Sequence, residues 1–204
     1  MKVTRNIIKE RTFVDPKDGL TKSRFGYRGQ NKIAWIVIHY AGSTSARGRA
    51  KGINESMQTW KRSVSSHYQI GEDGIFQAVE ERHCAWHCGG YKKENKCAAS
   101  NATAIGIDLI ERKGNSCTSS VNDCDWYFKD SVIDTGARFV AELADKYGIP
   151  MDHIIRHYDV TGKRCPRPFV GNDVNSITGE TGEFAWNEFL MKVENYRSQD
   201  DVEA

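Results

Sequence analysis

Residues 33–39 read Ile-Ala-Trp-Ile-Val-Ile-His, a short and almost continuously apolar run. Such a run, rich in β-branched residues, is typical of a strand buried on both faces of a sheet. It ends at His39, and a loop rich in Gly, Ser and Arg follows over 42–52. We therefore place His39 at the C-terminal end of a core strand, next to the crevice where α/β sheets hold their ligands.

Apolar periodicity on either side of this run predicts strands interleaved with helices. The helical segments repeat apolar residues every three or four positions, as Ile53, Met57, Trp60 and Val64 do. Asp73-Gly74 between two β-prone runs signals a hairpin. The predicted elements are a helix over 53–64, strands over 66–70, 75–79, 105–110 and 153–156, a helix ending at 147, and a last helix over 184–197. We expect an α/β fold, a single domain with a central mixed sheet flanked by helices.

The N-terminal 30 residues are polar and mixed, and they predict an irregular arm with at most one short strand. The domain would occupy 31–204, with its core at about 33–170. Long loops are expected over 80–103 and 111–125. Asp130 or Ser131 would cap the helix that follows, and Gly148 and Pro150 would end it.

The composition excludes several classes of protein. The 204 residues carry 29 Lys and Arg against 27 Asp and Glu, a net charge of +2, whereas nucleic-acid partners select a larger or more clustered surplus. No apolar run approaches the roughly 20 residues that span a bilayer, so membrane insertion is excluded. Residues 1–10 lack the apolar core of a secretory signal, which predicts synthesis in the cytoplasm without a Sec-type address.

Three residues point to metal chemistry. His39 and His157 each end a predicted strand, and Cys165 follows eight residues after His157. Two imidazoles and one thiolate leave a fourth position vacant, which is the composition of a catalytic zinc site and not of a closed structural one. On spacing alone, the alternative is that each residue is a partly buried His or Cys satisfied by the backbone.

The sequence around these residues resembles that of a known family. Segments 36–42 and 156–166 are similar to stretches of the zinc-dependent N-acetylmuramoyl-L-alanine amidases of the phage T7 lysozyme and peptidoglycan-recognition-protein family. The segment Ala85-Trp86-His87-Cys88-Gly89 resembles an Ala-Trp-His-Ala-Gly stretch of that family. Segments 66–74 and 105–109 also match, and the resemblance runs in order from about 33 to 170.

The resemblance implies a residue-level mechanism. It assigns His39, His157 and Cys165 as ligands of one zinc ion, and Lys163 as the group that stabilises the oxyanion. Asp108 falls where many members carry a glutamate that takes the proton of water, but aspartate is shorter by one methylene.

Two further positions bear on that mechanism. Ser66 occupies the position at which the T7-type enzymes have a tyrosine. The assistance that such a tyrosine would give to the substrate carbonyl is therefore absent. Glu111 is a second candidate base, although on a regular strand it would face away from Asp108.

The remaining candidates have two interpretations each. His67 and His87 would touch substrate or serve as framework histidines, and Trp86 would stack on a sugar or pack in the core. Cys117 and Cys124 would close a small loop by a disulfide in an oxidising compartment, or remain free thiols. The state of the other loop cysteines, Cys84, Cys88 and Cys97, is left open.

The expected function is zinc-dependent hydrolysis of the amide between N-acetylmuramic acid and L-alanine in peptidoglycan. The alternatives are a non-catalytic peptidoglycan-binding module, a zinc peptidase acting within the stem peptide, and a purely structural zinc site with four protein ligands. We expect a monomer of the phage or prophage endolysin type, which reaches the wall after holin-type release. An autolysin and a cytoplasmic recycling enzyme are the other settings.

Overall fold

The computed structural model describes residues 1–89, 97–115, 118 and 120–200. Its centre is a six-stranded sheet in which β6 and β7 run antiparallel and every other neighbouring pair is parallel. The strand order is β1 (Val3–Arg5), β7 (Gly74–Gln77), β6 (Tyr68–Gly71), β9 (Ala104–Leu109), β5 (Trp35–Tyr40) and β12 (Ile154–Arg156). The predicted α/β class with a mixed sheet is confirmed.

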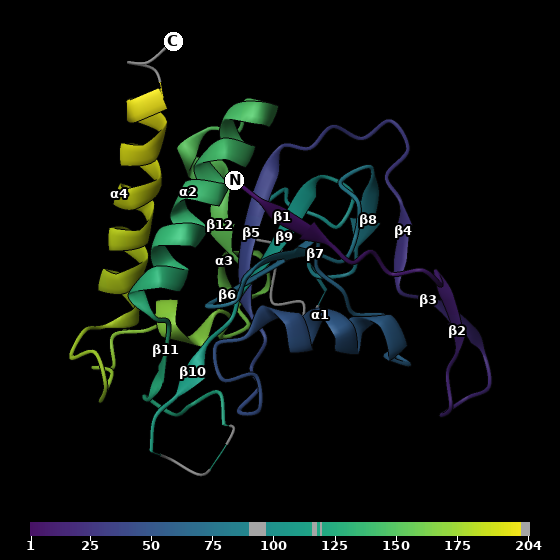
Figure 1. Cartoon of the computed structure of the whole chain (residues 1–204), viewed down its shortest axis with the longest axis horizontal. Helices are drawn as coiled ribbons and strands as arrows, with labels where there is room; N and C mark the ends of the chain where they lie inside the picture. The colour runs from purple at the N-terminus through teal and green to yellow at the C-terminus, as the bar shows by residue number, and fades with distance from the viewer. Residues whose placement is uncertain (90–96, 116–117, 119, 201–204) are drawn as a thin grey trace.

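Helices cover both faces of this sheet, as Figure 1 shows. Helices α2 (Asp130–Tyr147) and α4 (Gly182–Asp200) pack together, and α2 lies against β6 and β9. Helix α1 (Ala50–Thr59) lies against β6 and β7.

Strand alternation places α1 and α2 on opposite faces. On β6, Ile70 joins the core that α2 and α4 cover, whereas the neighbouring Gln69 accepts a hydrogen bond from Asn54 of α1 at 2.7 Å. Asp108 is the register partner of both Gln69 and His39, so it belongs to the α1 face. The polar candidates therefore share the face of the sheet that α1 covers.

The helix predicted over 53–64 is shorter than expected. Helix α1 ends at Thr59, Trp60 has extended backbone angles, and Val64 lies outside the helix with 48% of its surface exposed. The reason is a tertiary contact, because the buried Arg24 guanidinium donates to the Trp60 carbonyl at 3.0 Å.

The boundaries of α2 are partly as predicted. It ends at Gly148 in the left-handed region (φ 63°), which confirms the predicted stop. The predicted cap is wrong: Lys129 occupies the N-cap position without a side-chain hydrogen bond, and Asp130 is already helical. The predicted last helix is confirmed as α4.

The prediction of at most one strand in residues 1–30 is wrong. Strand β1 forms the edge of the central sheet, and the hairpin of β2 (Thr12–Val14) and β3 (Thr21–Ser23) follows. Strand β4 (Phe25–Tyr27) pairs with β8 (His83–Ala85). Strands β1 and β4 depend on partners far away in the chain, and all four strands have only three residues, too few to carry a clear strand signal.

The regions expected to be loops contain short elements. Besides β8, they contain β10 (Arg112–Lys113), which pairs with β11 (Trp126–Tyr127) just after the second region. A short helix α3 (His157–Thr161) directly follows β12. Cys117 lies outside the described residues, and so does its predicted pairing with Cys124. In the described part of the chain, no helix is long and apolar enough to cross a membrane.

Candidate functional site

The three predicted metal ligands meet at one edge of the sheet. His39 is near the end of β5, and His157 directly follows β12, the parallel neighbour of β5. Cys165 returns on the loop after α3. One ligand atom of each residue lies within 4.8 Å of the others, and Cys165 Sγ is 3.7 Å from His39 Nδ1. All three side chains are buried.

The ring of His157 is arranged like that of a metal ligand. Its Nδ1 is buried without a hydrogen-bond partner among the described residues, and its Nε2 lies 2.9 Å from the Gly89 carbonyl. Metal-bound histidines usually donate their second ring N–H to such a carbonyl, which fixes the tautomer. The orphaned nitrogen is therefore the one that is free to bind a metal.

The protonation of the cluster also suits a metal. Burial holds the pKa of His39 well below its usual value, and burial together with the Lys163 charge lowers that of His157 to about 4, so both rings are neutral. Burial raises the pKa of Cys165 to about 12 in the protein without metal. A bound cation would deprotonate the thiol, and zinc accepts this mixed set of nitrogen and sulfur donors. The donor set therefore fits zinc.

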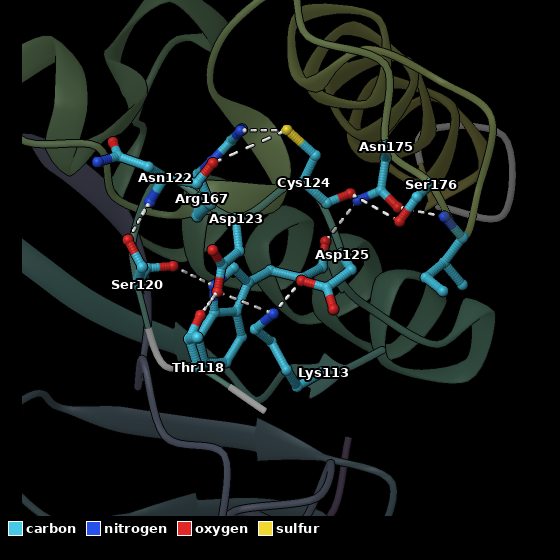
Figure 2. Close-up of polar contacts among 12 residues, drawn as sticks. Lys113, Thr118, Ser120, Asn122, Asp123, Cys124, Asp125, Arg167, Asn175 and Ser176 are labelled. Carbon is cyan, nitrogen blue, oxygen red and sulfur yellow. Dashed lines mark hydrogen bonds and ion pairs between the residues drawn. The ribbon is translucent and has the colours of Figure 1, made fainter. Parts of the chain in front are cut away.

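The segment that carries Cys165 is held in place by the loop between β10 and β11. Arg167 donates to Cys124 Sγ at 3.4 Å, and Arg164 donates to Asn122 at 3.2 Å. Within this loop Lys113 pairs with Asp123 at 3.1 Å and also with Asp125, as Figure 2 shows. The polar loop thus supports the metal-ligand segment from outside the cluster.

Asp108 lies beside the cluster with little stabilisation of its charge. Its Oδ2 accepts a hydrogen bond from Ser66 Oγ at 2.6 Å, and Ser66 in turn accepts from Gln69. Burial raises the pKa of Asp108 to about 6, although the Ser66 hydrogen bond and the Lys163 charge oppose this rise. A carboxyl group with such a pKa can exchange a proton near neutral pH.

Unlike Asp108, Glu111 binds the backbone of a neighbouring loop. Its two carboxylate oxygens accept from the backbone N–H groups of Ala41 at 3.0 Å and Ser43 at 2.7 Å. Burial raises its pKa to about 7. These contacts shape the loop after β5, and Glu111 is not among the described residues that line the cavity beside the cluster.

A cavity of about 690 Å³ opens over the cluster. Asp108 and Lys163 line it together with the three ligand candidates, and Ile53 and Met57 of α1 line it as well. Lys163 lines the same cavity, and its positive charge influences the pKa values of His39, His157, Asp108 and Cys165. The structure thus brings the five principal candidates together.

The three candidates for substrate contact have different positions. His67 is fully enclosed: its Nδ1 accepts from the Gly106 N–H at 2.9 Å, and it does not line the cavity. Trp86 lines the cavity, but its indole N–H donates to the Ser23 carbonyl at 3.0 Å. His87 lines the cavity only marginally, with 7% of its surface exposed, and its Nδ1 is 3.0 Å from His39 Nε2.

Two cavity-lining residues escaped the sequence analysis. Trp60 and Arg62 lie on the loop after α1, and the Arg62 guanidinium stacks over the Trp60 ring at 3.7 Å. They were missed because the predicted helix extended through them. The polar run Lys61-Arg62-Ser63 was the available signal that the helix ends earlier.

The chain is similar in sequence to curated amidases and similar in fold to several solved structures. The chain is 29% identical to CwlL of Bacillus licheniformis, an N-acetylmuramoyl-L-alanine amidase, over 87% of this chain and 45% of the relative. It is 38% identical to the amidase BlyA of Bacillus subtilis over 67% of this chain and 37% of the relative. The chain therefore spans less than half the length of these relatives.

The fold matches that of the catalytic domain of XlyA, with a TM-score of 0.65 and 16% identity over 95% of this chain and 99% of that one. The structure of PlyL gives a TM-score of 0.64 with 19% identity, over 95% of this chain and 97% of that one. The family model described as N-acetylmuramoyl-L-alanine amidase matches residues 29–168, which is more than half of the chain. This chain belongs to the N-acetylmuramoyl-L-alanine amidase family.

Proposed function

We propose that this protein hydrolyses the amide between the lactyl group of N-acetylmuramic acid and the L-alanine of the peptidoglycan stem peptide. The observation that carries the proposal is the buried cluster of His39, His157 and Cys165 on the floor of a cavity that also presents Asp108 and Lys163. Family membership supports the same reaction. Residues 31–204 would form the catalytic domain, with residues 1–30 packed against it.

His39, His157 and Cys165 would hold one zinc ion. When bound, zinc supplies a Lewis acid that polarises a carbonyl and lowers the pKa of water. The three donors offer Nδ1 of both imidazoles and the Cys165 thiolate. A structural zinc site would need a fourth protein ligand, and the cluster found among the described residues has three.

Asp108 would act as the general base and then as the general acid. Its pKa of about 6 leaves it ionised at neutral pH, ready to take a proton from water and to return it to the leaving amine. The Ser66 hydroxyl donates to Oδ2, which keeps the carboxylate oriented towards the cavity. The shorter aspartate is thus supported by a contact that a serine at position 66 provides.

Lys163 would stabilise the negative charge that develops on the carbonyl oxygen. Lys163 lines the cavity together with the ligand candidates and Asp108, and its charge influences the pKa values of Asp108 and Cys165. A fixed cation at this place lowers the energy of the tetrahedral species more than that of the ground state. Among the described residues that line the cavity, Arg62 and Lys163 are cations and Asp108 is the one carboxylate, which suits a stem peptide that bears carboxylates.

The test is digestion of purified peptidoglycan by the zinc-loaded protein, followed by mass spectrometry. We expect new L-alanine amino termini and intact muramic acid. A Cys165→Ser variant should lose this activity, because the alcohol replaces the thiolate donor. Cys84→Ser is the matched control, since Cys84 is equally buried but lies in β8 and does not line the cavity.

Other cleavage patterns would lead to the alternatives. Cuts within the stem peptide would keep the zinc chemistry and replace the bond assignment. Retained wall binding without any cleavage would place the protein in the recognition class. We propose a monomer of the endolysin type that acts on the cell wall, and light scattering of the purified chain tests the monomer directly.

A further inference from the structure

Both nitrogens of the His39 ring have buried partners. Nδ1 faces the Cys165 sulfur at 3.7 Å, and Nε2 lies 3.0 Å from Nδ1 of His87. The two rings stand nearly perpendicular, with an interplanar angle of 86°. Between two neutral imidazoles, a contact of this length is a hydrogen bond in which one nitrogen carries the proton and the other accepts it.

The direction of this hydrogen bond decides whether His39 can bind a metal. If His39 Nδ1 offers its lone pair to the cluster, the ring proton must lie on Nε2, and Nε2 then donates to His87. His87 Nδ1 must therefore be an acceptor, with its own proton on Nε2. We propose that His87 is a positioning residue that holds His39 in its Nε2–H tautomer with Nδ1 directed at the zinc. This inference rests on the proposed zinc site.

The surroundings of His87 hold its ring firmly enough for this role. Asn101 Oδ1 accepts from the backbone N–H of His87 at 2.9 Å and of Cys88 at 2.7 Å. Gly106 of β9 leaves room for the ring, since a Cβ there would lie 2.6 Å from His87 Cγ. The Cys88 thiol, 3.4 Å from His87 Nδ1, is a weaker donor than an imidazole N–H and does not replace His39.

The same short segment also orients the second histidine of the cluster. The Gly89 carbonyl is the partner of His157 Nε2 at 2.9 Å. Residues 87–89 therefore supply one acceptor to each imidazole, a ring nitrogen to His39 and a carbonyl oxygen to His157. His87 contacts the His39 nitrogen that does not face Cys165, and only 7% of its surface is exposed, so its main contact is with the ligand and not with the substrate.

The test compares two replacements of His87. Asparagine keeps an acceptor near the position of Nδ1, whereas leucine has a similar size and no acceptor. The zinc dissociation constant is measured by competition with a chromogenic chelator. We expect His87→Leu to weaken zinc binding by about 10–100-fold, and His87→Asn to restore most of the affinity. His153→Leu is the control and should bind zinc as the unchanged protein does, because His153 stacks on Trp35 and contacts the Ala34 carbonyl instead.

Two results would overturn the proposal: wild-type zinc affinity in His87→Leu, or equal weakening in the Leu and Asn variants, which would indicate a merely structural role.

A measurement on the unchanged protein covers the case in which His87→Leu does not fold. In the zinc-loaded, ¹⁵N-labelled protein, a through-hydrogen-bond coupling should join His39 Nε2 to His87 Nδ1, with the proton on His39. A proton on His87 Nδ1, or no coupling, would refute the assignment. Absence of zinc binding by the unchanged protein would instead refute the proposed metal site.

Discussion

At the scale of single residues, the ionised Asp108 that the proposed catalysis needs lowers the stability of the folded protein. Its carboxylate is buried, and burial raises its pKa from 3.8 to about 6. A raised pKa in the folded state favours the protonated form. The stability that this group contributes is therefore present below pH 3.8 and lost as the pH rises through about 6. At neutral pH the ionised side chain destabilises the protein.

Asp108→Asn should therefore stabilise the metal-free protein while it abolishes hydrolysis. The gain in free energy of unfolding should be about 3 kcal/mol at most at pH 7.5 and roughly half of that at pH 5. Urea unfolding at the two pH values measures it. Asp152→Asn is the control, because Asp152 is exposed and should change little at either pH. A gain that does not depend on pH would contradict the buried, ionised state of Asp108.

Lys163 is the second residue whose charge decides the chemistry. Replacing it with methionine keeps the length and apolar stem of the side chain but removes the ammonium. We expect kcat to fall by about 10²–10³-fold at saturating zinc, as for the loss of one oxyanion-stabilising group. The surface variant Lys32→Met provides the comparison and should keep full kcat, since Lys32 is exposed and away from the cavity. An unchanged kcat in Lys163→Met would remove Lys163 from the mechanism.

At the scale of elements, replacing a glycine with alanine should have opposite effects on the free energy of unfolding in β9 and in α1. Gly106→Ala in β9 would force a Cβ to 2.6 Å from the His87 ring, and it should lower the free energy of unfolding by about 1–3 kcal/mol. Gly52→Ala in α1 meets nothing within 4 Å and should raise the free energy of unfolding by about 0.5–1 kcal/mol. Denaturant unfolding of both variants tests the pair. Equal effects in the two elements would contradict the close packing of β9 against His87.

Elements were predictable where their own sequence carries the signal. The apolar run 33–39 and the 18-residue helix α2 are specified by local periodicity, and both formed. Strands β1 and β4 have three residues each and exist because β7 and β8 pair with them, so local pattern could not reveal them. The early end of α1 likewise depends on Arg24, which is distant in sequence.

At the scale of the whole molecule, the sequence predicted those parts of the candidate site that the central sheet positions. His39 and His157 are brought together because β5 and β12 are parallel neighbours, and Asp108 stands opposite His39 in register. His39 and Asp108 lie in strands and His157 directly follows one, and all three positions could be predicted from the sequence. The contacts of residues 87–89 with both histidines arise from loop geometry, for which the sequence held no signal beyond a family resemblance.

We expect the assembled site to make the stability of the whole protein depend on zinc. Without metal, His157 Nδ1 is buried without a partner among the described residues, which costs about 1–3 kcal/mol. Zinc that binds only the folded chain adds about 2.7 kcal/mol at a free concentration one hundred times its dissociation constant. For a chain of this size, that gain corresponds to a rise in Tm of roughly 5–11 °C. Differential scanning calorimetry with chelator or excess zinc measures the shift.

The cysteine variants locate the origin of that shift. Cys165→Ser should lose most of the zinc-dependent rise in Tm, because the hydroxyl is a poor replacement for a thiolate ligand. Cys84→Ser should keep the full rise, even if its metal-free Tm is lower, because Cys84 belongs to β8 and not to the cluster. A zinc-dependent rise of the same size in both variants would mean that zinc stabilises the fold from another place, and His39 and His157 would then have to be reinterpreted as framework histidines.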